Sequence, residues 1–328
     1  ADLYHECATV HTVVGEYDAA REVSERLLKR GRAADDPCLR GHALHSAAVV
    51  AGHVGDVNRV VHNAQRACEE LADAGMEWSR GVALLTLAQG QVRSGELDLA
   101  QAHIEEGLRL VGEHHRWPGY NPRGEASYYA GLISLLKGQL GDAVSSFNRA
   151  RTLATRAGEQ LFVALSHGFT GLALAFRGAY SMAIERLETG IGVGRRADLP
   201  LATASCSACA AWVHGMVGRY GTALRLADSV TEDHQIEFRD AHAIALLARG
   251  DAFMGLHDAE RALAAYQQAL QVAGLSHVAT VPTMRGIGLA YLHLGHVEQG
   301  IASLGNAVAF ATFGNLRWFR AQALRDLI

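Results

Sequence analysis

Four histidines near the start of the chain are the first residues whose type and spacing could do chemistry: His5, His42, His45 and His53. At about 100° per residue of a helix, His42 and His53 differ in direction by only about 20°. Such a group could bind a transition metal or an anion, or change its charge near neutral pH. However, a helix that rises about 1.5 Å per residue separates His42 from His53 by about 16 Å, too far for one zinc ion. We therefore expect solvated or packed histidines, and we predict no metal and no cofactor.

A second candidate is the Cys-x-x-Cys pair of Cys206 and Cys209. A redox pair of this kind belongs at the start of a helix that follows a strand, where the thiolate is stabilised. Here the pair lies inside an Ala-rich segment with helical periodicity, and a second such pair for zinc is missing from the sequence. We expect buried structural thiols. The sequence also lacks the GxxxxGK[ST], GxSxG and HExxH motifs, so we predict that the protein is not an enzyme.

The composition argues against several classes of partner. The chain has 328 residues, with 30 Lys and Arg against 34 Asp and Glu, and a formal net charge of −4. That near balance argues against direct binding of nucleic acid or an anionic membrane surface. No apolar stretch reaches the roughly 18 residues that a membrane span needs. The five cysteines are too few for a disulfide scaffold, and their number is odd, so we predict a cytoplasmic protein.

One turn pattern recurs along the whole chain and divides it into eight units. The turns start at Gly15, Gly55, Gly95, Gly138, Gly178, Gly218, His257 and Gly295. The period is about 40 residues, which indicates stacked structural repeats. Each turn lies between two segments in which apolar or small residues recur at helical spacing. We therefore predict an all-α fold of about eight helix–turn–helix repeats and a partial ninth.

Small residues and prolines support this register. The residue seven positions before each turn start is always Ala or Gly, as at Ala88 before Gly95. Two antiparallel helices need small side chains where their axes cross closely. The prolines all fall between the second helix of one predicted repeat and the first helix of the next, where they do not break a helix. They are Pro37, Pro118, Pro122, Pro200 and Pro282.

The pattern resembles the tetratricopeptide repeat (TPR) family. The seventh repeat carries the small and aromatic positions typical of that family at Gly250, Phe253, Ala262, Tyr266 and Ala269. The resemblance implies a right-handed superhelix whose first helices line a concave groove. The usual TPR unit is about 34 residues long, so these repeats are longer than usual. Such long repeats are similar to the sensor regions of large bacterial regulators of the maltose-regulator and LuxR type.

The longest step between turns falls at residues 114–123, where two prolines and two aromatic residues interrupt the pattern. We expect residues 1–328 to form one repeat domain, which this segment would subdivide into residues 1–113 and 124–328. The segment would be a binding loop or a hinge; in the alternative, its tryptophan fills a gap left by the longer connection. The loop residues proposed for binding are Trp117, Tyr120 and Arg123.

Two further expectations concern the ends of the sequence. It begins at Ala1 without a methionine and stops inside a helical pattern, so we expect a piece of a longer protein. Its last residues are apolar, including Trp318, Phe319 and Leu327. This apolar end would pack against a further repeat, a cap or a second copy of the chain.

The TPR register also predicts which residues line the groove: polar, His-rich ones at its N-terminal end, and apolar and aromatic ones in its middle. The predicted groove residues are His42, His45, Arg93, Tyr128, Leu132, Leu135, Phe176, Trp212, Met216, Asp251 and Arg285. Such a strip suits an amphipathic helix or an extended peptide, with aromatic anchors supplying most of the binding energy. In the alternative, several of the apolar residues pack between neighbouring first helices.

These features together predict a non-catalytic binding scaffold. It would recognise a protein or peptide segment, including one from the same chain, as the sensor part of a larger bacterial signalling or transcriptional regulator. A second hypothesis keeps the scaffold but makes its ligand a small effector, held by Tyr128, Trp212 and the 114–123 loop. A third, an enzyme with its active site in the groove, needs a nucleophile, a base or a metal site, and the sequence shows none.

Overall fold

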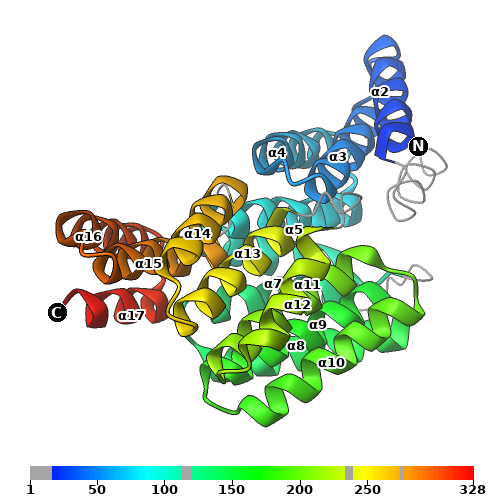
Figure 1. The fold of residues 1–328 in the computed structure, drawn as a ribbon. Helices are drawn as coiled ribbons and strands as arrows, with labels where there is room; N and C mark the ends of the chain where they lie inside the picture. Colours follow the sequence, from blue (N-terminus) through cyan, green and yellow to red (C-terminus); the bar gives the residue numbers. More distant parts are fainter. Residues whose placement is uncertain (1–16, 113–119, 233–238, 274–276) are drawn as a thin grey trace. The chain divides into compact units, whose positions relative to one another are not determined.

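The structure is a computed structural model that describes residues 17–112, 120–232, 239–273 and 277–328 (Figure 1). Every regular element of these residues is an α-helix, so the all-α expectation is confirmed for this part of the chain. None of these helices is both long and apolar enough to cross a membrane. The chain divides into two compact units, Ala1–Trp117 (unit 1) and Pro118–Ile328 (unit 2).

Unit 1 contains five described helices that pack as successive antiparallel pairs. They are α2 (Tyr17–Ala33), α3 (Pro37–His53), α4 (Val57–Asp73), α5 (Glu77–Ser94) and α6 (Leu97–Val111). Each helix contacts the next, and α3 and α5, the first helices of two successive repeats, also contact each other. The core between α3, α4 and α5 is filled by small and branched residues, among them Ala48, Ala64 and Leu84.

Unit 2 continues the same pattern over eleven described helices. They are α7 (Pro122–Leu136), α8 (Leu140–Ala157), α9 (Gln160–Phe176), α10 (Tyr180–Arg196), α11 (Pro200–Met216), α12 (Tyr220–Thr231), α13 (Arg239–Gly255), α14 (Ala259–Ala273), α15 (His277–His293), α16 (Val297–Phe313) and α17 (Arg317–Leu327). In this numbering the odd helices are the first helices of their repeats and the even helices are the second. Helix α17 is the first helix of the partial ninth repeat.

The turns explain the long repeat period. Helices α3 and α4 each have 17 residues, and a short turn follows each of them. Both turns place a glycine in the left-handed region, Gly55 with φ 79° and Gly75 with φ 67°. The seventh repeat has no glycine at its turn, and His257 takes the same conformation with φ 60°. Histidine enters this region more readily than most side chains do, so the repeat keeps its turn without glycine.

The small residue before each described turn lies at a close helix crossing, as the sequence predicts. Ala48, Ala88 and Ala211 are fully buried. A Cβ atom added at Gly171 of α9 would come within 2.9 Å of the backbone oxygen of Ala183 on α10. The crossings therefore leave room only for hydrogen or a methyl group, which is what allows the helices of a pair to approach each other.

One proline departs from the expectation. Pro282 lies inside α15 and not between two helices. Because proline has no N–H group and its ring crowds the carbonyl four residues earlier, α15 gives up one hydrogen bond near its start. Pro37, Pro122 and Pro200 lie at the beginning of helices, where the missing N–H group costs nothing, as expected. Pro118 lies outside the described residues.

The glycine at a crossing gives a stability prediction. A Cβ atom added at Gly250 would lie 2.4 Å from the ring of Tyr266. We expect Gly250→Ala to lower the free energy of unfolding by about 1–3 kcal/mol, because overpacking displaces the ring. Gly305→Ala is the matched control, since a Cβ atom there, inside α16, meets no atom within 4 Å. Urea titration should show no loss for this control; an equal loss in both variants would contradict the close crossing.

Candidate functional site

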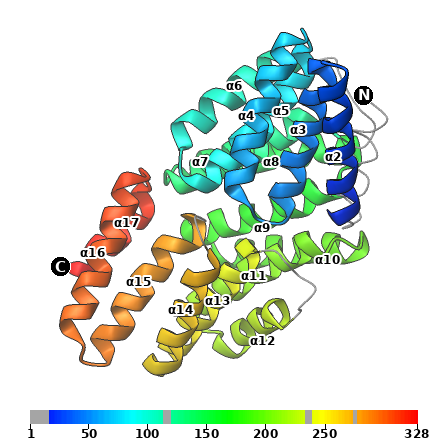
Figure 2. The same ribbon diagram turned by 90° about the horizontal axis from the view of Figure 1, so that it is seen from above.

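The first helices of unit 2 form its inner layer. They contact one another in order, from α7 through α9, α11, α13 and α15 to α17, and α17 in turn contacts α7. Each second helix from α8 to α16 instead packs against the first helix of its own repeat and that of the next (Figure 2). The inner helices are therefore the ones that could present a shared binding surface.

Side chains from five of these inner helices are linked one to the next, and we call this set the inner cluster. It consists of Phe176 on α9, Trp212 on α11, Asp251 on α13, Arg285 on α15, and Trp318 and Asp326 on α17. The cluster combines three aromatic rings with two carboxyl groups and one guanidinium group. Four of its members were predicted as groove residues from the sequence register alone.

The aromatic part of the inner cluster is centred on Phe176. The ring of Trp212 meets it edge-on at 5.4 Å between centroids. The indole of Trp318 stacks on it at 5.9 Å, and Phe319 meets it edge-on at 5.9 Å. Phe176 is thus shared between α11 on one side and α17 on the other. Contacts of this geometry stabilise by about 0.5–1.5 kcal/mol each beyond the apolar area that they bury.

The polar part is centred on Asp251. Its Oδ2 atom accepts a hydrogen bond of 2.9 Å from Trp212 Nε1, and its Oδ1 atom accepts one of 2.6 Å from the hydroxyl of Tyr266. Burial raises the pKa of Asp251, while these two bonds and the nearby charge of Arg285 act in the opposite direction. Arg285 also forms an ion pair with Asp326 on α17. Arg285 thus pairs with the carboxylate of α17 and also lies near enough to the carboxyl group of α13 to lower its pKa.

Tyr266 on α14 was predicted only as a family motif position, and the structure gives it a second role. Its ring lies between two helices, and a Cβ atom added at Gly250 or Gly286 would come within 2.4 or 2.5 Å of it. The ring is 1% exposed. The two glycines therefore form the slot that directs the hydroxyl group of Tyr266 onto Asp251.

Three other apolar groove residues of unit 2 lie on α7 and are not part of the inner cluster. Tyr128 is buried and packs against aromatic rings of α7, α8 and α9, the nearest being Tyr129 and Phe162 at 5.3 Å. Leu132 and Leu135 are also buried, Leu135 completely. Tyr128 thus packs among rings of α7, α8 and α9, and none of the three side chains is exposed.

Met216 differs from them, because it is 36% exposed at the C-terminal end of α11. Among the predicted groove residues of the inner helices, it therefore offers an accessible side chain for a binding test.

The predicted polar end of the groove lies in unit 1, where His42 and His45 are buried in α3. His45 Nε2 lies 3.0 Å from the hydroxyl of Thr86 on α5. Arg93 Nη1 donates a hydrogen bond of 3.0 Å to the backbone oxygen of Gly52. Burial, with the nearby charge of Arg93, lowers the pKa of His53 to about 4. These side chains tie α3 to α5, and no cluster of three potential metal ligands occurs in the described ranges. His5 lies outside them.

The start of unit 2 contains a group of carboxyls that the sequence did not single out. The hydroxyl of Tyr120 donates a hydrogen bond of 2.6 Å to Glu125 Oε2. Burial and the neighbouring Glu125 raise the pKa of Glu159 to about 8. Asn121 caps α7 by accepting hydrogen bonds from the backbone N–H groups of Arg123 and Gly124. Of the three predicted loop residues, Tyr120 and Arg123 thus lie at this helix start, and Trp117 is outside the described residues.

The cysteines of α11 are structural, as expected. Cys206 and Cys209 are free and buried. Burial raises the pKa of the Cys206 thiol to about 12, and the thiol donates a hydrogen bond of 3.4 Å to the backbone oxygen of Ala164. A reactive thiol needs a lowered pKa, so this pair does not have the properties of a redox site.

Comparison with known proteins gives structural matches only. No family model and no curated protein sequence matches the chain. A Rap protein complexed with competence and sporulation factor matches with a TM-score of 0.75 and 11% identity, over 94% of this chain and 84% of that one. NprR in complex with its cognate peptide NprX matches with a TM-score of 0.58 and 16% identity, over 84% and 82%. The Cut9–Hcn1 hetero-tetramer matches with a TM-score of 0.59 and 16% identity, over 99% of this chain and 56% of that one. The likeness confirms a helical-repeat solenoid of the TPR type.

Proposed function

We propose that this chain is a non-catalytic scaffold that recognises a peptide segment through its inner helices, as the regulatory part of a signalling protein. The observation that carries the proposal is that two of the matching solenoids hold a peptide or signalling factor, in the Rap and NprR complexes. Because the repeats are longer than the usual TPR unit, we extend the proposal: the scaffold is the sensor region of a larger bacterial regulator of the LuxR or maltose-regulator type. The free thiols of Cys68, Cys206 and Cys209 support a reducing, cytoplasmic setting.

The chemistry of the inner layer supports a peptide as the ligand. Peptide binding typically relies on a few aromatic anchors and a small number of charged groups that fix register. The inner cluster supplies both kinds of group. Two surface hollows, of about 320 and 430 Å³, contain no residue of the inner cluster. Helices α10, α11 and α12 line the first, and the turn between α13 and α14 and the ends of α13 and α15 line the second. A small effector held inside the inner layer is therefore the weaker candidate.

A matched pair of methionines tests the proposal. The probe is a library of short synthetic peptides, screened against the full chain, and the best binder is then titrated by fluorescence polarisation. Met216 on the inner helix α11 is 36% exposed, and Met182 on the second helix α10 is 55% exposed. We expect Met216→Glu to weaken binding by about tenfold or more, because a charge would replace an apolar contact, and Met182→Glu to leave it unchanged.

Two outcomes would count against peptide recognition by the inner helices. One is that both methionine variants bind the peptide equally well, which would place the binding site away from Met216. The other is a small metabolite that raises the melting temperature of a chain to which no library peptide binds. Since a ligand that binds only the folded state raises the melting temperature, this second result would favour the effector hypothesis.

A further inference from the structure

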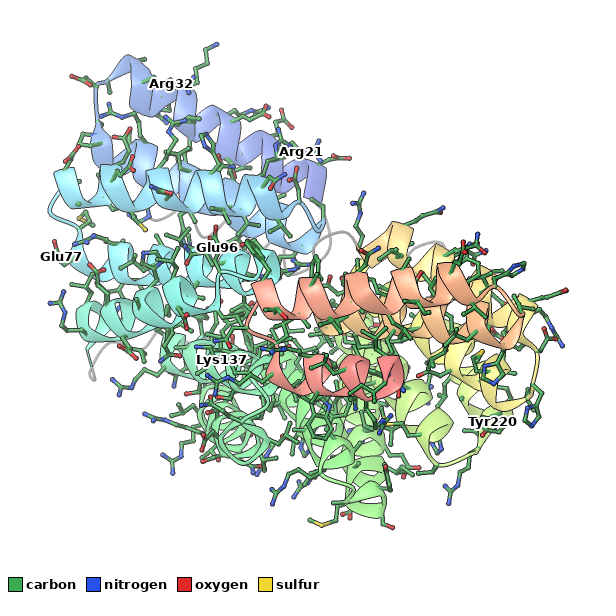
Figure 3. The ribbon with its side chains drawn as sticks, turned by 90° about the vertical axis from the view of Figure 1, so that its left-hand side faces the viewer. Arg21, Arg32, Glu77, Glu96, Lys137 and Tyr220 are labelled. Carbon is green, nitrogen blue, oxygen red and sulfur yellow. The ribbon has the colours of Figure 1, made fainter. Side chains whose placement is uncertain are left out.

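Helix α17 covers part of the inner layer of unit 2. Its first turn lies against the turn between α7 and α8, where a Cβ atom added at Gly138 would come within 3.2 Å of Trp318 Cβ. Figure 3 shows Lys137, which precedes this glycine, beside the first turn of α17. The helix therefore contacts α7 and α9 of repeats four and five as well as α15 and α16, its neighbours along the chain.

Two kinds of contact hold α17 on this surface. At its start the adjacent rings of Trp318 and Phe319 pack on Phe176. Two turns later Asp326 forms the ion pair with Arg285. Phe319 and Asp326 are seven residues apart, so they lie on the same face of the helix. An amphipathic helix thus already covers Phe176 and Arg285, the aromatic member of the inner cluster on α9 and its basic member on α15.

The fit of α17 is incomplete. Trp318 Nε1 is buried and has no hydrogen-bond partner among the described residues. A buried donor without an acceptor costs about 1–3 kcal/mol. When α17 leaves this surface, water can accept the hydrogen bond of the Trp318 indole. This gain favours replacement of α17 by a second helix that makes the other contacts.

We propose that α17 occupies the peptide-binding surface of unit 2 as an intramolecular ligand, and that the partner which replaces it is an amphipathic helix with the same chemistry. That partner carries two adjacent aromatic residues and, two turns later, a carboxylate that pairs with Arg285. This inference rests on the proposed function, and it adds both the class of peptide and the need for α17 to leave first. When the binding-competent state is a small fraction of the population, the apparent affinity falls by that fraction.

The test uses the full chain and a fluorescein-labelled synthetic peptide with the sequence of residues 314–328. The double variant Trp318→Ala/Phe319→Ala weakens the attachment of α17. We expect it to bind the peptide at least about tenfold more tightly than the unchanged chain does, because more of the population has a free surface. Asp326→Asn is a milder variant that breaks only the ion pair, and it should strengthen binding by a smaller factor.

Three controls make the result specific to this surface. Phe313→Ala removes a 94% exposed ring close to α17 in sequence, and it should bind the peptide as the unchanged chain does. Phe176→Ala added to the double variant should abolish binding. A peptide in which both aromatic residues are alanine should not bind any variant.

The proposal is overturned if the double variant and Asp326→Asn both stay helical by circular dichroism and neither binds the peptide more tightly than the unchanged chain. In that case α17 is a fixed part of the solenoid. Library peptides that still bind the unchanged chain, with Met216→Glu weakening them, would then leave peptide recognition intact and reject only the role of α17.

Discussion

Asp251→Ala is expected to lower the free energy of unfolding of the chain by about 3 kcal/mol, because each buried donor left without an acceptor costs about 1–3 kcal/mol. The substitution removes the acceptor of both Trp212 Nε1 and the Tyr266 hydroxyl. These two side chains are 4% and 1% exposed, so water cannot replace the lost carboxylate without a rearrangement. Urea unfolding followed by circular dichroism measures the loss.

Two further variants distinguish the loss of the two hydrogen bonds to Asp251 from the general effect of removing a carboxylate. Asp142→Ala removes an exposed carboxylate from the second helix α8, and we expect it to change the free energy of unfolding by less than about 0.5 kcal/mol. Tyr266→Phe removes one of the two donors and should cost about 1 kcal/mol. If Asp251→Ala proves no more destabilising than Asp142→Ala, the carboxylate does not organise the inner cluster.

The second large effect is a pH dependence set by Glu159. Its pKa is raised from 4.5 to about 8, first by burial and then by the neighbouring Glu125. The folded chain therefore keeps a proton on this carboxyl that the unfolded chain has already lost. Stability from this group is fully present below about pH 4.5 and is lost as the pH rises through 8. The side chain is partly exposed, so we expect a loss on the order of 2 kcal/mol.

Glu159→Gln should remove most of this loss, because the amide stays neutral at every pH. The measurement is the free energy of unfolding from urea titrations between about pH 5 and pH 9. Glu185→Gln on α10 replaces an exposed carboxylate and should follow the unchanged chain across the range. A Glu159→Gln profile that falls as steeply as that of the unchanged chain would show that other groups cause the pH dependence.

The repeat architecture could be predicted because it is encoded locally. Each turn needs a residue that enters the left-handed region, and each crossing needs a small side chain. Both kinds of residue therefore recur at a fixed spacing in the sequence. Pro282 shows the limit of that reasoning. Its position looked like a junction because prolines usually mark helix boundaries, yet α15 continues through it at the cost of one hydrogen bond.

The candidate site could be predicted only in part. The register placed Phe176, Trp212, Asp251 and Arg285 on the inner helices, and the structure links them. Asp326 was missed, although its position seven residues after Phe319 shows that the two share a helix face. The contact of α17 with α7 leaves no local signal, because it depends on small rotations that add up over the intervening repeats.

That contact also constrains the number of repeats that can lie between α7 and α17. In an open solenoid each repeat touches only its neighbours, so a repeat can be gained or lost by duplication or deletion without disturbing distant ones. Unit 2 differs, because α7 and α17, which belong to the fourth and ninth repeats, contact each other. One repeat more or fewer between them would move α17 by about one helix spacing of 8–10 Å and separate it from Phe176. Changes in copy number within residues 122–313 are therefore constrained in a way that substitutions on the outer helices are not.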